Sequence, residues 1–204
     1  MPRKPNTHLT AEEILQAAKK LLINNGYEGL SMRKLAAKLD CQAPSIYYYY
    51  ENKNAIIEKL IEEGFGILIE IDQKTAAKPI TPLERIEEFC RNYIDFAFDN
   101  PGYYYVMYSI KLNSVDLKEK IYEQERILGG VLIETVKEGI DDGSVKVQNP
   151  LLLITYCWCV LHGLITTMAK GRIDSRFETD TIKETVLNVL FNSYQIQSIN
   201  DVNH

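Results

Sequence analysis

The sequence predicts an all-α protein of about nine helices, with a three-helix N-terminal head and a larger C-terminal helical body. Three observations support this fold class. Apolar residues recur at spacings of three and four along most of the 204 residues. The sequence carries no hairpin signal and no ladder of alternating residues. An apolar share of 46% is ample for a buried core. We expect residues 1–53 to form the head and residues 54–204 the body.

The first helix is expected to run from about Thr10 to Asn25. Thr10 and Glu13 have the spacing of a capping box, in which each side chain accepts a hydrogen bond from the other residue's backbone. Gly26 should end the helix. Its buried face should hold Ile14, Ala17, Ala18, Leu21 and Leu22.

Two short helices should follow, joined by a tight turn. Ser31 is a typical N-cap for a helix over residues 32–39. Asp40 and Cys41 should form the turn, because aspartate tolerates the left-handed conformation that such a turn often needs. Pro44 suits the first turn of the next helix, where a missing N–H group costs nothing.

The body is expected to contain six further helices. Paired Gly129 and Gly130 interrupt one of them and indicate a bend or a close contact. The expected ranges are 53–73, 84–98, 103–112, 116–140, 150–169 and 179–197.

One segment, residues 151–169, is uncharged over nineteen residues and approaches the length that spans a bilayer. It holds several polar side chains, and charged residues do not flank it as an anchor would require. A helix buried on most sides, in a core or a subunit interface, is therefore favoured over a membrane span. We expect no membrane partner.

The net charge of −5 hides an asymmetry. Residues 1–53 hold eight Lys and Arg against five Asp and Glu, a net charge of +3, whereas the remainder has a net charge of −8. A basic head on an acidic body suits a polyanion bound at one end. The first residues lack the apolar stretch of a secretory signal, so a cytoplasmic location is expected.

No constellation of residues points to catalysis. The sequence contains no paired carboxylates, nucleophile elbow, phosphate loop or metal-binding spacing, so we expect neither an enzyme nor a cofactor. Cys157 and Cys159 would point to different sides of a helix and could not hold a metal together. All four cysteines are expected to be buried, reduced thiols, namely Cys41, Cys90, Cys157 and Cys159.

The second and third helices, with the turn between them, have the pattern of a helix-turn-helix. In this motif the N-terminal residues of the second helix reach base edges in the major groove of double-stranded DNA. Gln42 is expected to read adenine, and Ala43 or Pro44 to touch a thymine methyl group. The other expected contacts, mostly to phosphates, are Ser31, Arg33, Ser45, Tyr47, Tyr48, Tyr49 and Lys53. Ser31 also serves as a cap, Pro44 also starts a helix, and Arg33 is also a typical solvated charge.

At these positions the chain resembles the TetR family of transcriptional regulators, over about residues 10 to 60. The family signature appears as Ser31, Ile46–Tyr47, Tyr50 and Lys53, after the Ala17–Ala18, Leu21 and Gly26–Tyr27 pattern of the first helix. Asp40 stands where the family usually has glycine, and Tyr49 stands where histidine is common.

The resemblance implies a homodimer formed mainly through the last two helices. The expected interface residues are Trp158, Leu161, Ile165, Val186, Leu190 and Tyr194. A monomeric core completed by both helices is the alternative.

The resemblance also implies a small-molecule effector bound in the body. An aromatic set with a few polar tips is the expected pocket, namely Tyr93, Phe96, Tyr104, Tyr108, Trp158 and His162. The same residues are also typical of plain core. The leading hypothesis is thus a repressor released from a palindromic operator by an effector. The alternative is a DNA-binding or protein-regulating module of the same fold with no effector.

Overall fold

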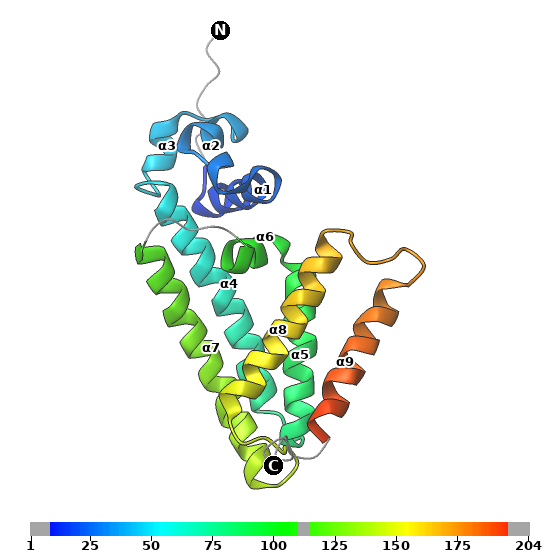
Figure 1. The fold of residues 1–204 in the computed structure, drawn as a ribbon. Coiled ribbons are helices and arrows are strands. Elements are labelled where there is room, and N and C mark those ends of the chain that lie inside the picture. The colour runs from blue at the N-terminus through cyan, green and yellow to red at the C-terminus, as the bar shows by residue number, and fades with distance from the viewer. Residues whose placement is uncertain (1–8, 110–114, 196–204) are drawn as a thin grey trace. The chain divides into compact units, whose positions relative to one another are not determined.

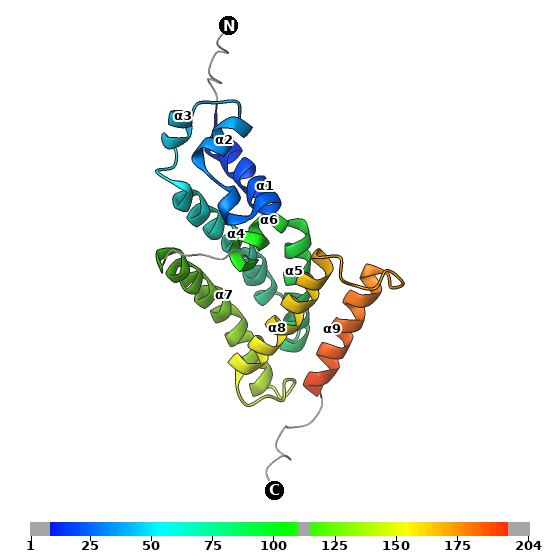
Figure 2. The same cartoon turned by 45° about the horizontal axis from the view of Figure 1, so that its top comes forward.

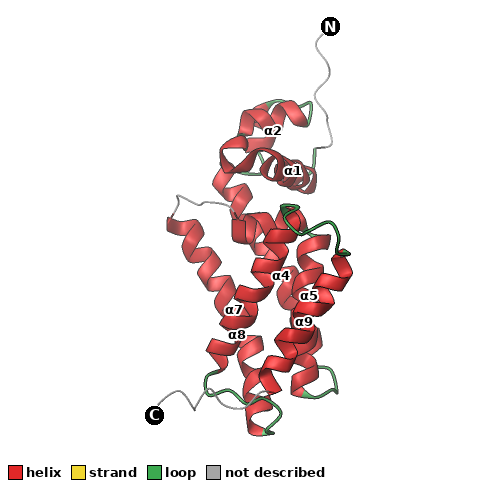
Figure 3. Ribbon diagram, turned by 45° about the vertical axis from the view of Figure 1, so that its right-hand side comes forward, coloured by secondary structure: helices red, strands yellow, loops and turns green. Residues whose placement is uncertain are grey.

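The chain folds into helices throughout the part that we describe. The computed structural model describes residues 9–109 and 115–195, with side chains as far as Asn192, and no strand occurs among them (Figures 1 and 3). The all-α prediction is confirmed. The elements are α1 (Ala11–Gly29), α2 (Met32–Lys38), α3 (Ala43–Tyr47), α4 (Lys53–Ala76), α5 (Pro82–Asp99), α6 (Pro101–Tyr104), the π-helix η1 (Tyr105–Ser109), α7 (Val115–Asp141), α8 (Pro150–Ala169) and α9 (Thr179–Gln195).

The chain divides into two compact units. The first consists of Met1–Ile67 and Asn100–Glu125, and the second of Leu68–Asp99 and Arg126–His204. Helices α4 and α7 therefore each contribute to both units. The unit that contains the head extends beyond residue 53, since it takes in the first part of α4, all of α6 and η1, and the start of α7.

The first unit is built around α1, with α2 and α3 packed beside each other (Figure 2). The predicted capping box at the start of α1 is present. The Thr10 backbone N–H donates to Glu13 Oε2 at 2.8 Å, and the Glu13 N–H donates to Thr10 Oγ1 at 3.2 Å. Fully buried apolar side chains from four helices form the core, among them Ile14, Leu22, Leu35, Ile46 and Leu60. Their burial stabilises each helix beyond its own propensity.

Helix α1 is interrupted where the sequence indicates. Gly26 has φ 67° and ψ −174°, which is outside the helical region, and a short helical turn then continues to Gly29. A side chain is disfavoured at this φ, so glycine is the natural residue there.

Several helix boundaries differ from the predictions. Helix α5 starts at Pro82, two residues early, because Thr81 forms a capping box in which its N–H donates to Glu84 at 2.8 Å. The predicted aromatic helix begins at Pro101 and changes to a π-helix at Tyr105, and its last residues lie outside the described part. A Cβ atom at Gly129 or Gly130 would meet nothing within 4 Å. Of the two predicted alternatives, a close contact is therefore absent within the described chain, and the bend stays a prediction.

Helix α8 has the predicted bounds but not the predicted burial. By length and composition this helix could cross a membrane, yet only 28% of its apolar window is buried inside the chain. Leu151, Leu152 and Trp158 are exposed by 57%, 68% and 41%. Of the two predicted environments, burial in the core of a single chain is therefore wrong for most of this helix, and burial in a subunit interface stays a prediction.

Candidate nucleic-acid interface and ligand region

Helix α3 presents its polar end to solvent and anchors itself through one apolar residue. Ile46 is fully buried. Gln42 is the N-cap, with φ −90° and ψ 146°, and its exposed side chain makes no capping hydrogen bond. Pro44 lies in the first turn and is also exposed. The amide of Gln42 is thus left available for a partner outside the chain.

The turn before α3 has the left-handed residue that the sequence predicts. Asp40 has φ 51°, the only positive value among the described residues other than glycine. The Cys41 N–H donates to the Ala36 carbonyl at 3.0 Å and closes the turn. This geometry fixes α3 against α2, and these two helices have the order and spacing of a helix-turn-helix.

Three consecutive tyrosines project from the end of α3. Tyr47, Tyr48 and Tyr49 are exposed by 52%, 83% and 40%, and the rings of Tyr48 and Tyr49 meet edge to face at 5.0 Å. The Tyr49 hydroxyl donates to the Leu9 carbonyl at 2.5 Å. Tyr49 therefore already holds the chain that enters α1, whereas the other two rings extend into solvent.

The remaining predicted contacts have structural roles as well. Ser31 caps α2 by accepting from the Lys34 N–H at 3.2 Å, and Arg33 beside it is exposed. The Lys53 ammonium lies 3.7 Å from the centroid of the Tyr27 ring. This cation–π contact keeps a positive charge at the start of α4. Ala43 and Ser45, on α3, are half-buried. The structure thus brings all ten predicted residues together on α2, α3 and the start of α4, but it does not test whether they touch DNA.

A buried lysine in the first unit was missed by the sequence reasoning. Lys19 is 9% exposed, and its ammonium lies 3.7 Å from the centroid of the Tyr103 ring. The Tyr103 hydroxyl in turn donates to Glu63 at 2.8 Å. Burial lowers the pKa of Lys19 and raises that of Tyr103. The available signal was the position of Lys19 between Leu15 and Leu22 on the apolar face of α1.

The predicted effector residues are divided between the two units. In the second unit Tyr93 and Phe96 are buried, and the Trp158 ring stacks on His162 at 5.0 Å, where burial lowers the pKa of the imidazole.

The other two belong to the first unit. There the rings of Tyr104 and Tyr108 lie 5.1 Å apart. Whether any of the six residues touches a ligand stays a prediction.

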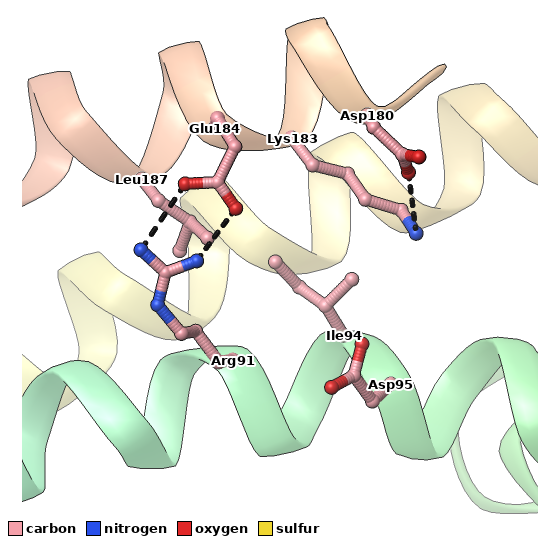
Figure 4. A pocket seen from close by; sticks show the side chains of 7 residues that line it. All are labelled: Arg91, Ile94, Asp95, Asp180, Lys183, Glu184 and Leu187. Carbon is pink, nitrogen blue, oxygen red and sulfur yellow. Dashed lines mark hydrogen bonds and ion pairs between the residues drawn. The ribbon is translucent and has the colours of Figure 1, made fainter.

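A shallow pocket of about 200 Å³ opens between α5 and α9, lined by other residues (Figure 4). Both cations that line it are already paired. Arg91 donates to both oxygens of Glu184 at 2.6 and 3.1 Å, and Lys183 lies 3.6 Å from Asp180. None of the predicted aromatic residues lines it. Because its cations are neutralised and its walls are open, the pocket offers little to a ligand.

The predicted dimer residues require a correction. Leu161, Ile165 and Leu190 are only 2%, 1% and 1% exposed within a single chain, so they pack in the core of the second unit. Val186 is half-buried, and the side chain of Tyr194 lies outside the described part. Of the five predicted residues whose side chains are described, only Trp158 is exposed. The available apolar surface on these helices consists of Leu151, Leu152, Tyr156, Trp158 and Val189.

The cysteines and acids show no metal site. None of the four cysteines forms a disulfide. Cys90 and Cys157 are buried, and their thiols form a hydrogen bond in the core of the second unit. Cys41 is half-buried and Cys159 is exposed, so the prediction of burial is wrong for these two. Among the described residues, no cluster of His, Cys, Asp and Glu side chains has an arrangement that could hold a metal ion.

This geometry defines a class: an all-α protein with an exposed helix-turn-helix on a helical body. Comparison with known proteins identifies the family. Residues 14–60 match the model of the tetR family of bacterial regulatory proteins, and residues 86–190 match the tetracyclin repressor-like C-terminal domain. The chain belongs to the TetR family and is a DNA-binding transcriptional regulator.

Relatives agree with this assignment. The uncharacterized HTH-type transcriptional regulator YobS of Bacillus subtilis is 30% identical over 81% of this chain and 82% of its own length. The negative regulator IcaR of the icaADBC biofilm operon in Staphylococcus aureus is 24% identical, over 72% and 81% respectively. The solved structure of Bacillus subtilis FadR with stearoyl-CoA superimposes with a TM-score of 0.76 at 21% identity, covering 89% of this chain and 98% of FadR.

Proposed function

We propose that this regulator is a repressor, that it binds a palindromic operator as a homodimer, and that a small-molecule effector releases it. The observation that carries the proposal is the exposed end of α3, where Gln42, Tyr47 and Tyr48 have solvent-facing side chains above a buried Ile46. Exposed aromatic rings in a row are costly unless a partner covers them. The negative regulator IcaR is a relative that supports repression.

The roles on DNA follow from position on the motif. Gln42, Ala43, Pro44 and Ser45 begin α3 and therefore face base edges, where a glutamine amide pairs with adenine. The phosphates are contacted by Ser31, Arg33, Tyr47, Tyr48, Tyr49 and Lys53. In a dimer the two copies of α3 would enter successive major grooves, about 34–36 Å apart.

The dimer surface is assigned to the outer faces of α8 and α9. Leu152 and Val189 are exposed by 68% and 64%, on helices whose other sides pack against their own chain. Covering such residues in a four-helix contact between two chains would remove them from water. Burial in this interface would also remove the exposed apolar side chains of α8 from water, as expected for a cytoplasmic protein.

The effector is assigned to the second unit. FadR was solved with stearoyl-CoA bound, so a protein of this fold holds a small molecule. A ligand releases DNA only if it binds one conformation better than the other. Helix α4 starts in the head at Lys53 and ends in the second unit at Ala76, so it provides a continuous connection for this coupling.

Selection of bound fragments from a random double-stranded DNA pool tests the DNA role. We expect one palindromic motif to be enriched. Gln42→Ala should relax selectivity at a single base position, whereas Lys53→Ala should weaken binding to all sequences and lower the salt slope by about one unit. A pool that shows no enrichment after repeated rounds contradicts the proposal.

Sedimentation of two matched variants tests the dimer. Leu152→Glu places a charge on α8, and Tyr122→Glu places one on α7 at the same 68% exposure. We expect a monomer for Leu152→Glu and a dimer for Tyr122→Glu. If the two variants sediment alike, the interface lies elsewhere.

A further inference from the structure

The core-facing side of α4 changes from apolar to polar in the second unit. Phe65 and Leu68 are buried, and the next two residues on this face are Asp72 and Thr75, which are 3% and 2% exposed. The spacing of three and four continues the apolar stripe. An ionisable side chain at such a position is unusual, because charged groups are almost never fully buried unless they are paired.

Asp72 is only half satisfied. The Asn92 amide donates to Thr75 Oγ1 at 2.9 Å and also forms a hydrogen bond with the Asp72 carboxyl. Oδ1 of Asp72 has no hydrogen-bond partner among the described residues. One other buried side-chain atom of the described residues lacks a hydrogen-bond partner, namely Nε of Arg85. The other two nitrogens of this guanidinium donate hydrogen bonds to the Ala76 carbonyl and to the Glu138 carboxylate.

No basic side chain in the described part supports the charge of Asp72. Burial raises its pKa to about 7, against the Asn92 hydrogen bond, which lowers it. Lys78 and Arg85 of the same unit form ion pairs with other acids, Glu88 and Glu138 respectively.

Two titratable groups of α5 lie at this face of α4. The Cys90 thiol is neutral because its hydrogen bond with Cys157 and its burial raise its pKa. Glu88 accepts a hydrogen bond from Thr75 Oγ1 at 3.5 Å and is paired with Lys78.

A buried carboxylate oxygen without a donor costs about 1–3 kcal/mol, and more when charged. A ligand with a positive hydrogen-bond donor would remove that penalty and form a charge-assisted bond, of the stronger kind. The rest of the core of this unit is largely apolar, and Phe89, Ile94 and Leu153 are among its buried residues. A molecule that carried a carboxylate would instead meet a like charge.

We propose that Asp72 anchors a ligand site in the second unit, and that its ligand is an amphiphilic amine, with an ammonium group donating to Oδ1 and an apolar body among the buried aliphatic and aromatic side chains. The inference rests on the proposed function in treating this ligand as the effector. It separates this protein from FadR, whose bound molecule is a fatty acyl thioester.

Three probes of one chain length test the site on the full-length protein: decylamine, decanol and decanoate, each below the concentration at which it aggregates. Calorimetric titration is performed at pH 8 on the unaltered chain and on Asp72→Asn, which keeps the shape of the side chain and removes its charge. Glu70→Gln is the matched control, since Glu70 is an exposed acid on the same helix. Asp72→Ser replaces Asp72→Asn if circular dichroism shows that the amide variant is unfolded.

We expect decylamine to bind saturably and more tightly than the other probes. Its Kd should rise at least tenfold in Asp72→Asn and stay within twofold in Glu70→Gln. The site assignment is overturned if decylamine does not bind, if it binds Asp72→Asn as tightly as the unaltered chain, or if decanoate binds equally well.

A parallel gel shift on the selected operator separates this inference from the proposed function. Release of DNA by decylamine, lost in Asp72→Asn, supports both. Saturable binding through Asp72 without release upholds the site and removes its role as an effector site. Release by decanoate that is independent of Asp72 upholds effector control and overturns the amine site.

Discussion

The two compact units differ in whether their buried polar groups have interaction partners. In the first unit, Lys19 lies against the Tyr103 ring and Tyr103 donates to Glu63, so a buried cation is covered and compensated. In the second unit, Asp72 and Arg85 hold the two unpaired buried side-chain atoms of the described residues. A core whose buried polar groups are all hydrogen-bonded favours one rigid arrangement. A buried group without a hydrogen-bond partner can instead gain free energy when a ligand supplies one. The contrast suits a head that displays a fixed surface and a body that responds to a ligand.

The largest expected effect tests whether the head is a rigid support for its exposed tyrosines. Ile46→Ala removes a fully buried side chain from α3 and should destabilise the protein by about 2–5 kcal/mol. Tyr48→Ala, at 83% exposure, should change stability by less than about 0.5 kcal/mol yet weaken operator binding. Denaturant melts and gel shifts measure both. Equal loss of stability in the two variants would contradict the division between support and display.

The second expected effect is a gain of stability, and it concerns Asp72 in the second unit. Below about pH 4 the Asp72 carboxyl is protonated in both the folded and the unfolded chain. Between there and pH 7 the unfolded chain loses its proton while the folded chain keeps it, so stability falls as the pH rises and then levels off. The facing Cys90 thiol stays protonated throughout this window.

Asp72→Asn removes this pH dependence. At pH 8 the variant should be more stable than the unaltered chain by roughly 1–3 kcal/mol, because a neutral amide costs less to bury than a carboxylate. Melting at pH 5 and pH 8 measures the difference, which should nearly vanish at pH 5. A variant that is less stable at pH 8 would show that the carboxylate is paired after all.

A smaller effect sharpens the contrast in the head. Tyr103→Phe keeps the ring over which Lys19 lies and removes the hydroxyl that donates to Glu63. Because Glu63 is half-buried, we expect a loss of about 1 kcal/mol in the free energy of unfolding. Tyr122→Phe, at an exposed position, is the control and should be neutral. No loss in Tyr103→Phe would mean that the hydrogen bond is replaced by water.

The smallest effect concerns the turn before α3. Asp40→Gly relieves the left-handed backbone but adds entropy to the unfolded chain, so the net change should stay within about 1 kcal/mol. Asp40→Val, whose branched side chain is strained at φ 51°, should cost more than the glycine variant. Thermal melts rank the two. A valine variant as stable as the original would argue against the left-handed turn.

Local signals predicted most of the helix ends and the turn. The capping box at Thr10, the break at Gly26 and the positive φ of Asp40 depend on residues within a few positions of each other. Interactions between residues so close in the chain can be predicted from the sequence. The ten residues proposed to contact DNA share one motif for the same reason.

Apart from some helix boundaries and the π-helix, the predictions that failed concerned contacts between distant segments. The sequence shows that Leu161, Ile165 and Leu190 are apolar, and only packing shows that they are buried in their own chain. Lys19 and Asp72 occupy core-facing positions, but a spacing pattern alone does not tell whether a charged residue there finds a partner. The π-helix at Tyr105–Ser109 gives no signal that separates it from an α-helix.

By itself, the sequence determined the helical fold and the helix-turn-helix, because periodicity, caps and turn residues act over a few positions. The motif residues of the head also carried the resemblance to the TetR family, which the comparison with known proteins confirmed. Only the tertiary structure decided which polar groups are paired. Asp72 and Lys19 are both buried ions, yet one lacks a donor for Oδ1 and the other is covered by an aromatic ring. The physical reason is that burial and pairing depend on segments brought together by folding, and these set the cost of every charge in the interior.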